Sequence, residues 1–350
     1  MFGHHRFKFL ATAAMFGFLV WFWTRAVPAT PGVHLRQGLE DLEKSEYSKA
    51  EQHFRAELQL VAQQPIASEK LAMLLVQSGR RWEASRYIET VLSQPTVRYD
   101  NLASLTGDPH ESIDQSILEE WHHRAPADPA PLIGLAKIAF KNGQTGEARD
   151  LVQKVMAVNP HELEAHVVAG EIIQATAASE LFGWNQSLPE TAEHHPGIWF
   201  VRGHWCQQSG EPQMAARCFL EGLRLDPDNR RASLQLGQLL GPDRGKLFLD
   251  RAEQLQQLND SLARIQGPDS LQGAWVAVEI LQSLGRVREA AHWVRIAMST
   301  NPHLMQRMMT DAEFAESTNR ILLEGESDKH VNPASAIDRR DFPEWQPTKL

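Results

Sequence analysis

Hydrophobic and small residues recur along this chain at fixed offsets, in paired segments separated by polar turns. Four times a glycine stands five residues before an alanine, and in the last three copies a proline follows the alanine by 12 residues. Glycine readily takes the left-handed conformation that ends a helix, and proline cannot continue a helix interior. The pattern therefore predicts repeated helix–turn–helix units, with anchors at Gly79 and Ala84, Gly143, Ala148 and Pro160, Gly210, Ala215 and Pro227, and Gly285, Ala290 and Pro302.

The sharpest copy of the pattern runs from Gly197 to Asn229. In it, Gly203 and Ala215 are small because two helices are expected to cross there. An aromatic, a small residue, an alanine, an aromatic and a proline at set offsets resemble the tetratricopeptide repeat (TPR), a helical hairpin of about 34 residues. These positions are Trp199, Gly203, Ala215, Phe219 and Pro227.

The TPR resemblance implies an all-α fold, a right-handed α-solenoid of TPR-like helix–turn–helix repeats. The uncharged stretch near the start predicts that a single N-terminal hydrophobic helix precedes this solenoid. In such an array each unit packs mainly on its neighbours, so we expect one elongated body. One copy near the start carries Ser45 where the glycine would be. The expected parts are a leader at 1–26, a linker at 27–33, a solenoid at 34–302 (clear units near 34–64, 65–95, 129–160, 197–229 and 271–302; degenerate units near 96–128, 163–196 and 230–266), a capping helix at 303–323 and a polar tail at 324–350.

The amino terminus carries a stretch without charge from Phe9 to Thr24, flanked by Lys8 and Arg25. Sixteen helical residues span about 24 Å, somewhat less than the roughly 30 Å of a bilayer core. We expect a signal anchor or transmembrane helix through residues 9–24, with the repeats on the extracytoplasmic side of the membrane. One alternative is a cleaved signal peptide, and thus a secreted protein, since Val27-Pro28-Ala29 offers small residues suited to cleavage. The other is a buried amphipathic helix, against which the lack of a polar face between Phe9 and Trp23 argues.

Charge argues against nucleic acid as a partner. The net charge is −9, and a phosphate backbone requires a clustered basic face. Two cysteines, Cys206 and Cys218, lie on the two helices of one predicted unit. Two interpretations remain open for them: small buried side chains, or a disulfide in an oxidising compartment.

The motifs that could carry catalysis, a cofactor or a metal ion fail when their spacing is tested. The segment from Gly241 to Lys246 lacks the glycine spacing, the Ser or Thr and the preceding strand of a phosphate-binding loop. His161 and His166 lie five apart instead of the four that places two ligands on one helix face. We therefore predict no catalytic site, no cofactor and no metal, and expect the pairs at 122–123 and 194–195 to be solvent-facing residues at unit junctions.

The TPR resemblance also implies where a partner binds, because first helices of such units line a concave groove. We expect this protein to be a membrane-tethered scaffold that binds and positions a partner protein, as a peptide or helix in the groove. The alternatives are a structural accessory subunit or regulator of an enzyme complex, and an enzyme with a site in the groove. The candidate lining is Ile133, Lys137, Phe140, Lys141, Phe200, His204, Gln207, Gln208, Trp275, Glu279 and Gln282.

The end of the chain leaves the repeat pattern. Residues 324–350 are polar and contain three prolines. Two interpretations are open: a disordered tail, or a segment that folds back over the solenoid. In the second case Phe342 and Trp345 would be the anchors, since these aromatic residues often carry contacts of this kind.

Overall fold

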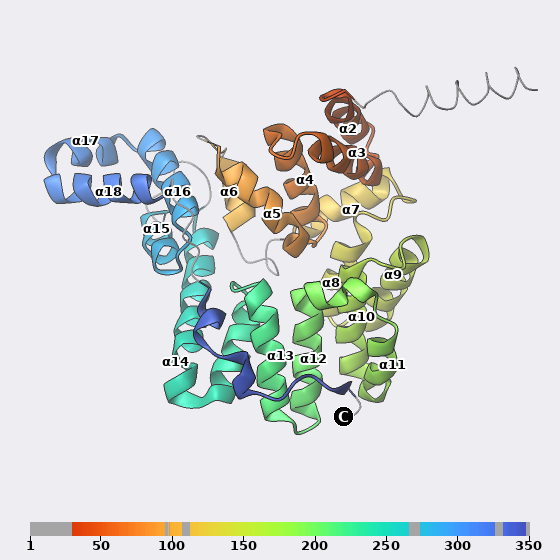
Figure 1. The fold of residues 1–350 in the computed structure, drawn as a ribbon. Helices are drawn as coiled ribbons and strands as arrows, with labels where there is room; N and C mark the ends of the chain where they lie inside the picture. Colours follow the sequence, from red (N-terminus) through yellow and green to blue (C-terminus); the bar gives the residue numbers. More distant parts are fainter. Residues whose placement is uncertain are drawn as a thin grey trace, which may run out of the picture.

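Helical hairpins make up the described part of the chain, which in this computed structural model comprises residues 30–94, 97, 99–106, 113–265, 274–325 and 332–347. Figure 1 shows them following one another around a curved body. Five hairpins coincide with the segments in which the repeat pattern is clearest: α2 (Val33–Glu43) with α3 (Tyr47–Leu60), α4 (Pro65–Gln77) with α5 (Arg81–Leu92), α8 (Leu132–Lys141) with α9 (Thr145–Val158), α12 (Pro196–Gln208) with α13 (Pro212–Leu225), and α15 (Ala274–Ser283) with α16 (Val287–Thr300).

The turns inside these hairpins share one geometry. Gly79, Gly143, Gly210 and Gly285 have φ between 77° and 79°, and Ser45 has φ 59° at the equivalent place in the first hairpin. In each turn the next residue donates its N–H to a carbonyl five residues back, as in the bond from Glu211 to the Cys206 oxygen at 2.9 Å. This bond satisfies a carbonyl at the helix end that would otherwise lack a partner. The recurring glycines therefore set the path of the chain.

The segments between these hairpins depart further from the repeat. They contain two short helices, α6 (Tyr99–Thr106) and α7 (Gln115–Arg124), then α10 (Leu163–Thr176) with the one-and-a-half-turn α11 (Leu181–Gln186). The third such segment is α14 (Arg230–Ala263), which bends sharply at Gly241, where φ is 76° and ψ is 179°. The resemblance to a phosphate-binding loop thus falls on a bend between two helical arms.

The bend of α14 brings two glycines into backbone contact. A Cβ added to Gly245 would lie 2.0 Å from the carbonyl oxygen of Gly237. We predict that Gly245→Ala lowers the free energy of unfolding by roughly 1–3 kcal/mol, because the two arms would have to separate. Urea denaturation checks this against Gly146→Ala, where the added methyl meets nothing within 4 Å. Equal stability of the two variants would show that the arms do not touch at Gly237.

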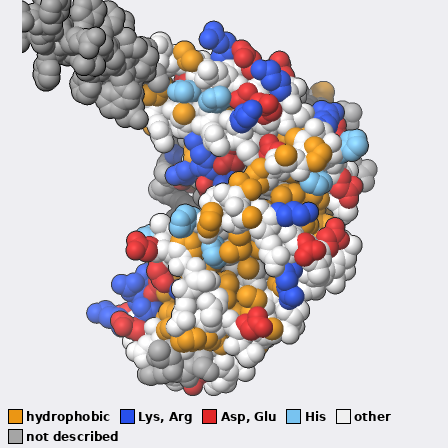
Figure 2. Space-filling model, turned by 90° about the vertical axis from the view of Figure 1, so that its right-hand side faces the viewer, with side chains coloured by type: hydrophobic (Ala, Val, Ile, Leu, Met, Phe, Trp, Pro, Cys, Tyr) orange, Lys and Arg blue, Asp and Glu red, His pale blue; other side chains and the backbone are white. Residues whose placement is uncertain are grey.

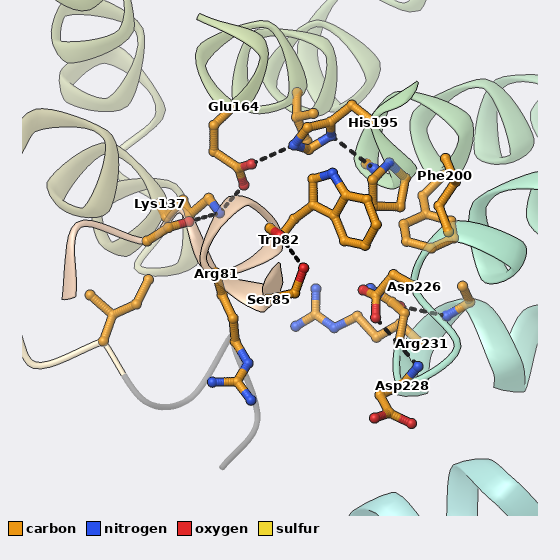
Figure 3. A pocket seen from close by; sticks show the side chains of 18 of the residues that line it. Arg81, Trp82, Ser85, Lys137, Glu164, His195, Phe200, Asp226, Asp228 and Arg231 are labelled. Carbon is orange, nitrogen blue, oxygen red and sulfur yellow. Dashed lines mark hydrogen bonds and ion pairs between the residues drawn. The ribbon is translucent and has the colours of Figure 1, made fainter. Parts of the chain in front are cut away.

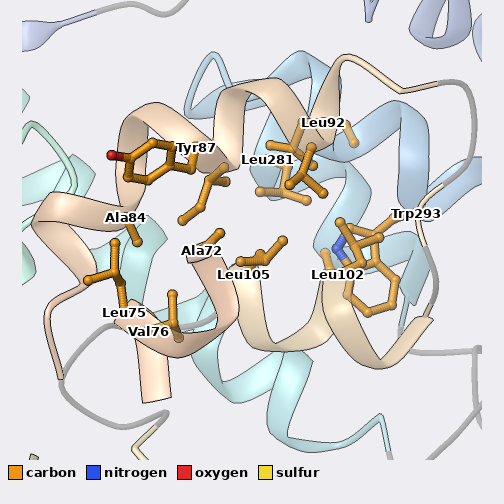
Figure 4. Packing of buried hydrophobic residues seen from close by; sticks show 14 of the residues in the cluster. Ala72, Leu75, Val76, Ala84, Tyr87, Leu92, Leu102, Leu105, Leu281 and Trp293 are labelled. Atoms are coloured by element: carbon orange, nitrogen blue, oxygen red, sulfur yellow. The ribbon is translucent and has the colours of Figure 1, made fainter. Parts of the chain in front are cut away.

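The ends of the helical array meet, which differs from the elongated body that the repeats predict. In Figure 1, α6 of the first half lies beside α16 of the last. The first and last hairpins share one hydrophobic core, which includes Leu102 and Leu105 from α6 and Leu281 and Trp293 from α15 and α16. Figure 4 shows these side chains pointing toward one another. The solenoid is therefore closed into a ring, and we call the α5–α6 contact with α15–α16 the seam.

Polar contacts also cross the seam. The ring nitrogen Nε2 of His292 lies 2.8 Å from the carbonyl oxygen of Leu92. Arg286 donates across the seam to the Thr106 carbonyl at 3.0 Å, whereas Arg81 of α5, on the same side of the seam as α6, donates to the Leu105 carbonyl. The last carbonyls of a helix lack partners within the helix and attract cations, so both arginines bind the end of α6 favourably.

The carboxyl-terminal part also departs from prediction. In place of one capping helix at 303–323, the chain forms α17 (Pro302–Thr310) and α18 (Ala312–Glu324). Asp311 separates them, because its backbone is extended and its side chain accepts from the N–H of Phe314 at the start of α18. Residues 332–347 then run across α13 and α12 in Figure 1, and we call them the C-terminal strap.

Three further predictions concern the leader and the cysteines. Residues 1–26 and the first three residues of the linker at 27–33 lie outside the described residues. Among the helices that are described, none combines the length and the apolar character needed to cross a bilayer. Cys206 and Cys218 are buried and free, so no disulfide forms between them in the structure.

The surface carries charges of both signs. Figure 2 shows one face, on which Lys and Arg side chains alternate with Asp and Glu around a band of hydrophobic atoms. A face of this kind lacks the single-sign field that steers a protein toward nucleic acid.

Candidate functional site

The ring of hairpins surrounds a partly open cavity of about 900 Å³. Its walls come from α5, α8, α10, α12, α14 and the start of α16, together with the turn between α13 and α14. The volume is near the upper end of the roughly 300–1,000 Å³ typical of ligand pockets. Because every wall belongs to a different hairpin, the cavity exists only while the ring is closed.

Five of the eleven residues predicted for the groove line this cavity: Lys137, Phe140, Lys141, Phe200 and His204. The other six lie elsewhere. Ile133 is 4% exposed in the core between α8, α9 and α10, so it is not available to a partner. Trp275 packs against Phe314 of α18, with ring centroids 4.9 Å apart. The remaining four line no part of the cavity: Gln207, Gln208, Glu279 and Gln282.

A buried chain of charges holds one wall together (Figure 3). The Glu164 carboxylate binds the Lys137 ammonium with one oxygen and the Nε2 of His195 with the other, at 2.8 Å. Lys137 also donates to the carbonyl of Gly79 at 2.5 Å. The nearby Lys137 and His195 hold the pKa of Glu164 far below its ordinary value, against the opposing effect of burial. This chain fastens α8, α10 and α12 to the turn between α4 and α5.

The placement of His195 corrects the prediction that it faces solvent. It is 6% exposed, and its Nδ1 accepts from the N–H of Gly197, which caps α12. Both ring nitrogens are thereby engaged within the protein. A histidine that transfers protons needs one nitrogen within reach of the substrate, so this arrangement is structural rather than catalytic.

Other charged side chains of the cavity have no ionic partner. Within the described ranges, Arg231 and Glu171 make no ion pair or hydrogen bond, and Nη1 of Arg81 is buried without a partner. Burial, and then the charge of Arg286, lower the pKa of Arg81, while burial raises the pKa of Glu171. Arg81 and Glu171 are half-buried, where an unpaired charge is costly, and Arg231 is exposed to the cavity. These groups can therefore bind a ligand with polar groups of its own.

Aromatic and aliphatic side chains lie between these charges. Trp82 and Phe200 are both half-buried, and both lie near the unpaired Arg231 in Figure 3. Leu258 and Ile138 add aliphatic surface to the lining. A few placed polar groups in an otherwise apolar wall are the usual composition of a binding pocket.

Asp226 gives the cavity a response to pH. Burial and the neighbouring Asp228 raise its pKa to about 6 from an ordinary 3.8. Between these two values the folded chain binds a proton that the unfolded chain does not. The free energy of unfolding therefore falls as the pH rises through this window, and the loss persists above it.

We predict that Asp226→Asn removes this loss. Near neutral pH the variant should gain stability on the order of 1 kcal/mol, a figure reduced for the partial exposure of the side chain. Below pH 3.8 parent and variant should match. Thermal unfolding across the pH range checks this, and a variant less stable than the parent at neutral pH would argue that the carboxylate is stabilised by its surroundings.

The described parts of the chain contain no candidate metal site. No group of three or more His, Cys, Asp or Glu side chains there is arranged to hold an ion. The predicted absence of a cofactor stays a prediction.

Comparison with known proteins adds one structural similarity. No protein-family model matches the chain, and no curated protein is similar to it in sequence. Among solved structures, the crystal structure of the P58(IPK) TPR domain at 2.5 Å is similar, with 16% identity and a TM-score of 0.23. The similarity covers 83% of this chain and 77% of that one. The TPR-like hairpins described above follow from this chain's own turns and helices.

Proposed function

We propose that this protein is a helical-repeat scaffold that holds a short segment of a partner protein in its central cavity. The observation that carries the proposal is a set of polar groups without partners, Nη1 of Arg81 and the side chains of Arg231 and Glu171, beside Trp82 and Phe200 in one cavity. A peptide supplies both backbone amides and carbonyls for such groups, and a side chain for the aromatic surface.

We further propose that residues 9–24 tether the scaffold to a membrane, with the repeats on the extracytoplasmic side. The support is the uncharged stretch between Lys8 and Arg25 and the aromatic residues at its end. A double change, Phe16→Arg with Leu19→Arg, should release the chain from carbonate-washed membranes, since charge at the centre of a span is costly. Retention of the variant in the membrane fraction would exclude this stretch as the tether.

Crosslinking from inside the cavity tests the scaffold proposal. A photoreactive amino acid at Ser85, an exposed cavity residue of α5, should capture one partner in native membranes. Combining it with Trp82→Ala and Arg231→Ala should reduce capture at least about tenfold, because both side chains belong to the proposed contact. The variant must keep the helix content of the parent, so that the loss of capture reflects the lost contact and not unfolding.

A control position separates recognition from chance contact. Glu180 is exposed and does not line the cavity, so the same photoreactive residue there should not capture that partner. Two results would contradict binding in the cavity. One is equal capture from both positions, and the other is capture from Ser85 that stays unchanged when Trp82→Ala and Arg231→Ala are added. Either result is expected if this protein is instead an accessory subunit that contacts its complex through its own outer surface.

A further inference from the structure

The C-terminal strap lies on a surface that faces away from the cavity. It contacts the side of α12 that carries Trp199, Arg202 and Trp205, whereas Phe200 and His204 of the same helix line the cavity. Figure 1 shows the strap crossing α13 and α12 as an irregular segment with no long helix of its own. This outer face of α12–α14 is therefore a second surface, independent of the proposed function.

Arginines of this outer face bind the main chain of the strap. Arg217 donates to the carbonyl of Arg339 at 2.7 Å, and Arg224 donates to the carbonyl of Ile337 at 3.2 Å. In return Asn332 donates to the carbonyl of Arg224 at 3.0 Å. Contacts to the main chain give affinity to any extended segment, whatever its side chains, as in known modes of peptide recognition.

Side chains of the strap supply the selective contacts. Trp345 packs edge-on against Trp205 with centroids 5.5 Å apart, and the Arg202 guanidinium lies 5.3 Å from the Trp345 ring. Phe342 packs on the core beneath α13 and α14. Such aromatic and arginine pairs dominate the binding energy of many interfaces.

One charged pair completes the recognition. Arg244 of α14 binds the carboxylate of Asp341 at 2.6 Å and lies 5.6 Å from the ring of Phe342. The side chains of both members of the pair are about half exposed, at 51% and 49%. An exposed pair adds little stability but favours an acidic residue at this place over a basic one.

The strap has the character of a bound ligand more than of a core element. Of its residues only Pro333 and Ala334 are buried, whereas Ile337, Phe342 and Trp345 are half-buried and most others are exposed. We propose that the outer face of α12–α14 is a peptide-recognition surface that the strap occupies within the same chain. Its external partner is a protein segment of the same chemistry: extended, with an aspartate followed directly by a phenylalanine, and a tryptophan three residues further on.

Competition between the strap and a free peptide tests this inference. The probe is a labelled peptide of residues 332–347, and the protein is the full chain carrying Phe342→Ala and Trp345→Ala, which releases the strap. Fluorescence anisotropy should show this variant binding the peptide at least about tenfold more tightly than the parent, whose own strap competes at high effective concentration. A peptide with Arg340→Ala should bind equally well, since the hydrogen bonds of the Arg340 side chain within the described residues go to Asp338 of the strap itself.

Two further variants keep the test decisive. Adding Arg217→Ala to the released variant should weaken peptide binding at least about tenfold. Should the released variant melt below the parent, Asp341→Ala in the parent removes only an exposed pair from the strap, leaves Arg244 available to the free peptide, and should raise peptide affinity by a smaller factor. Failure of the peptide to bind a folded, released chain would overturn the inference. A parent that dimerises through its strap, and loses the dimer in the released variant, would identify a second copy as the occupant and overturn the external partner.

Discussion

Trp293→Ala is expected to lower the free energy of unfolding by about 3–5 kcal/mol, the usual cost of removing a large buried aromatic side chain. Trp293 is fully buried at the seam, in the core that joins α6 to α15 and α16. Its indole N–H donates to the hydroxyl of Thr106 at 3.3 Å. The substitution leaves a void in the core that joins the two ends of the ring, so the variant should also populate an open form.

Urea denaturation and small-angle scattering measure these two effects separately. Met309→Ala is the matched control, since Met309 is 85% exposed on α17 and its truncation should change stability by less than about 0.5 kcal/mol. An increased radius of gyration in the Trp293 variant alone supports the closed ring. A Trp293 variant as stable as the control would show that the seam is not a packed core.

Glu164→Ala is expected to cost about 3–5 kcal/mol as well, because it leaves Lys137 and His195 without their carboxylate in a buried place. Glu147→Ala serves as the comparison, since Glu147 is exposed and binds only Gln144 nearby. Because Glu164 connects three walls, peptide capture in the cavity should fall together with stability. A loss no larger than that of the Glu147 variant would mean that Lys137 and His195 find other partners.

The pH dependence of Glu164 gives a second measure of the same contact. Its pKa in the folded chain is below the ordinary 4.5, so its contribution is fully present above that value. The contribution is lost as the pH falls below 4.5 toward the folded pKa. The Glu164 variant should therefore show a shallower loss of stability on acidification than the parent. If the free energy of unfolding falls equally in parent and variant on acidification, the Glu164 carboxylate does not stabilise the cavity wall.

The hairpins were predictable from sequence because their determinants are local. A glycine in the left-handed conformation ends each first helix, and the φ of Ser45 shows that even the exception occupies the same place. Gly203 is small for the expected reason, since a Cβ there would lie 2.9 Å from the ring of Phe219. Information of this kind is contained within about one repeat of sequence.

Closure of the ring was not predictable in this way. Leu102 and Leu105 find partners such as Trp293 nearly 190 residues later, and no local pattern selects them. The lining of the cavity could not be predicted fully from local sequence patterns either. Lys137 and Phe200 lie on first helices of hairpins, which the repeat pattern identifies. Arg81 and Trp82 lie on a second helix, which faces the interior only because the ring closes. The prediction that His195 faces solvent was wrong, because it took the proline after His195 as the sign of an exposed junction.

The distance across the seam tests the closed ring most directly. Spin labels on cysteines introduced at Ser93 and Arg295 would report it, because Ser93 follows Leu92 and Arg295 lies one turn from His292, whose side chain contacts the Leu92 carbonyl at 2.8 Å. Both native cysteines are buried and should stay unlabelled. The closed ring predicts one short, narrow distance that lengthens in the Trp293→Ala background. A long, broad distribution in the parent chain would contradict the ring, and with it the cavity that the ring surrounds.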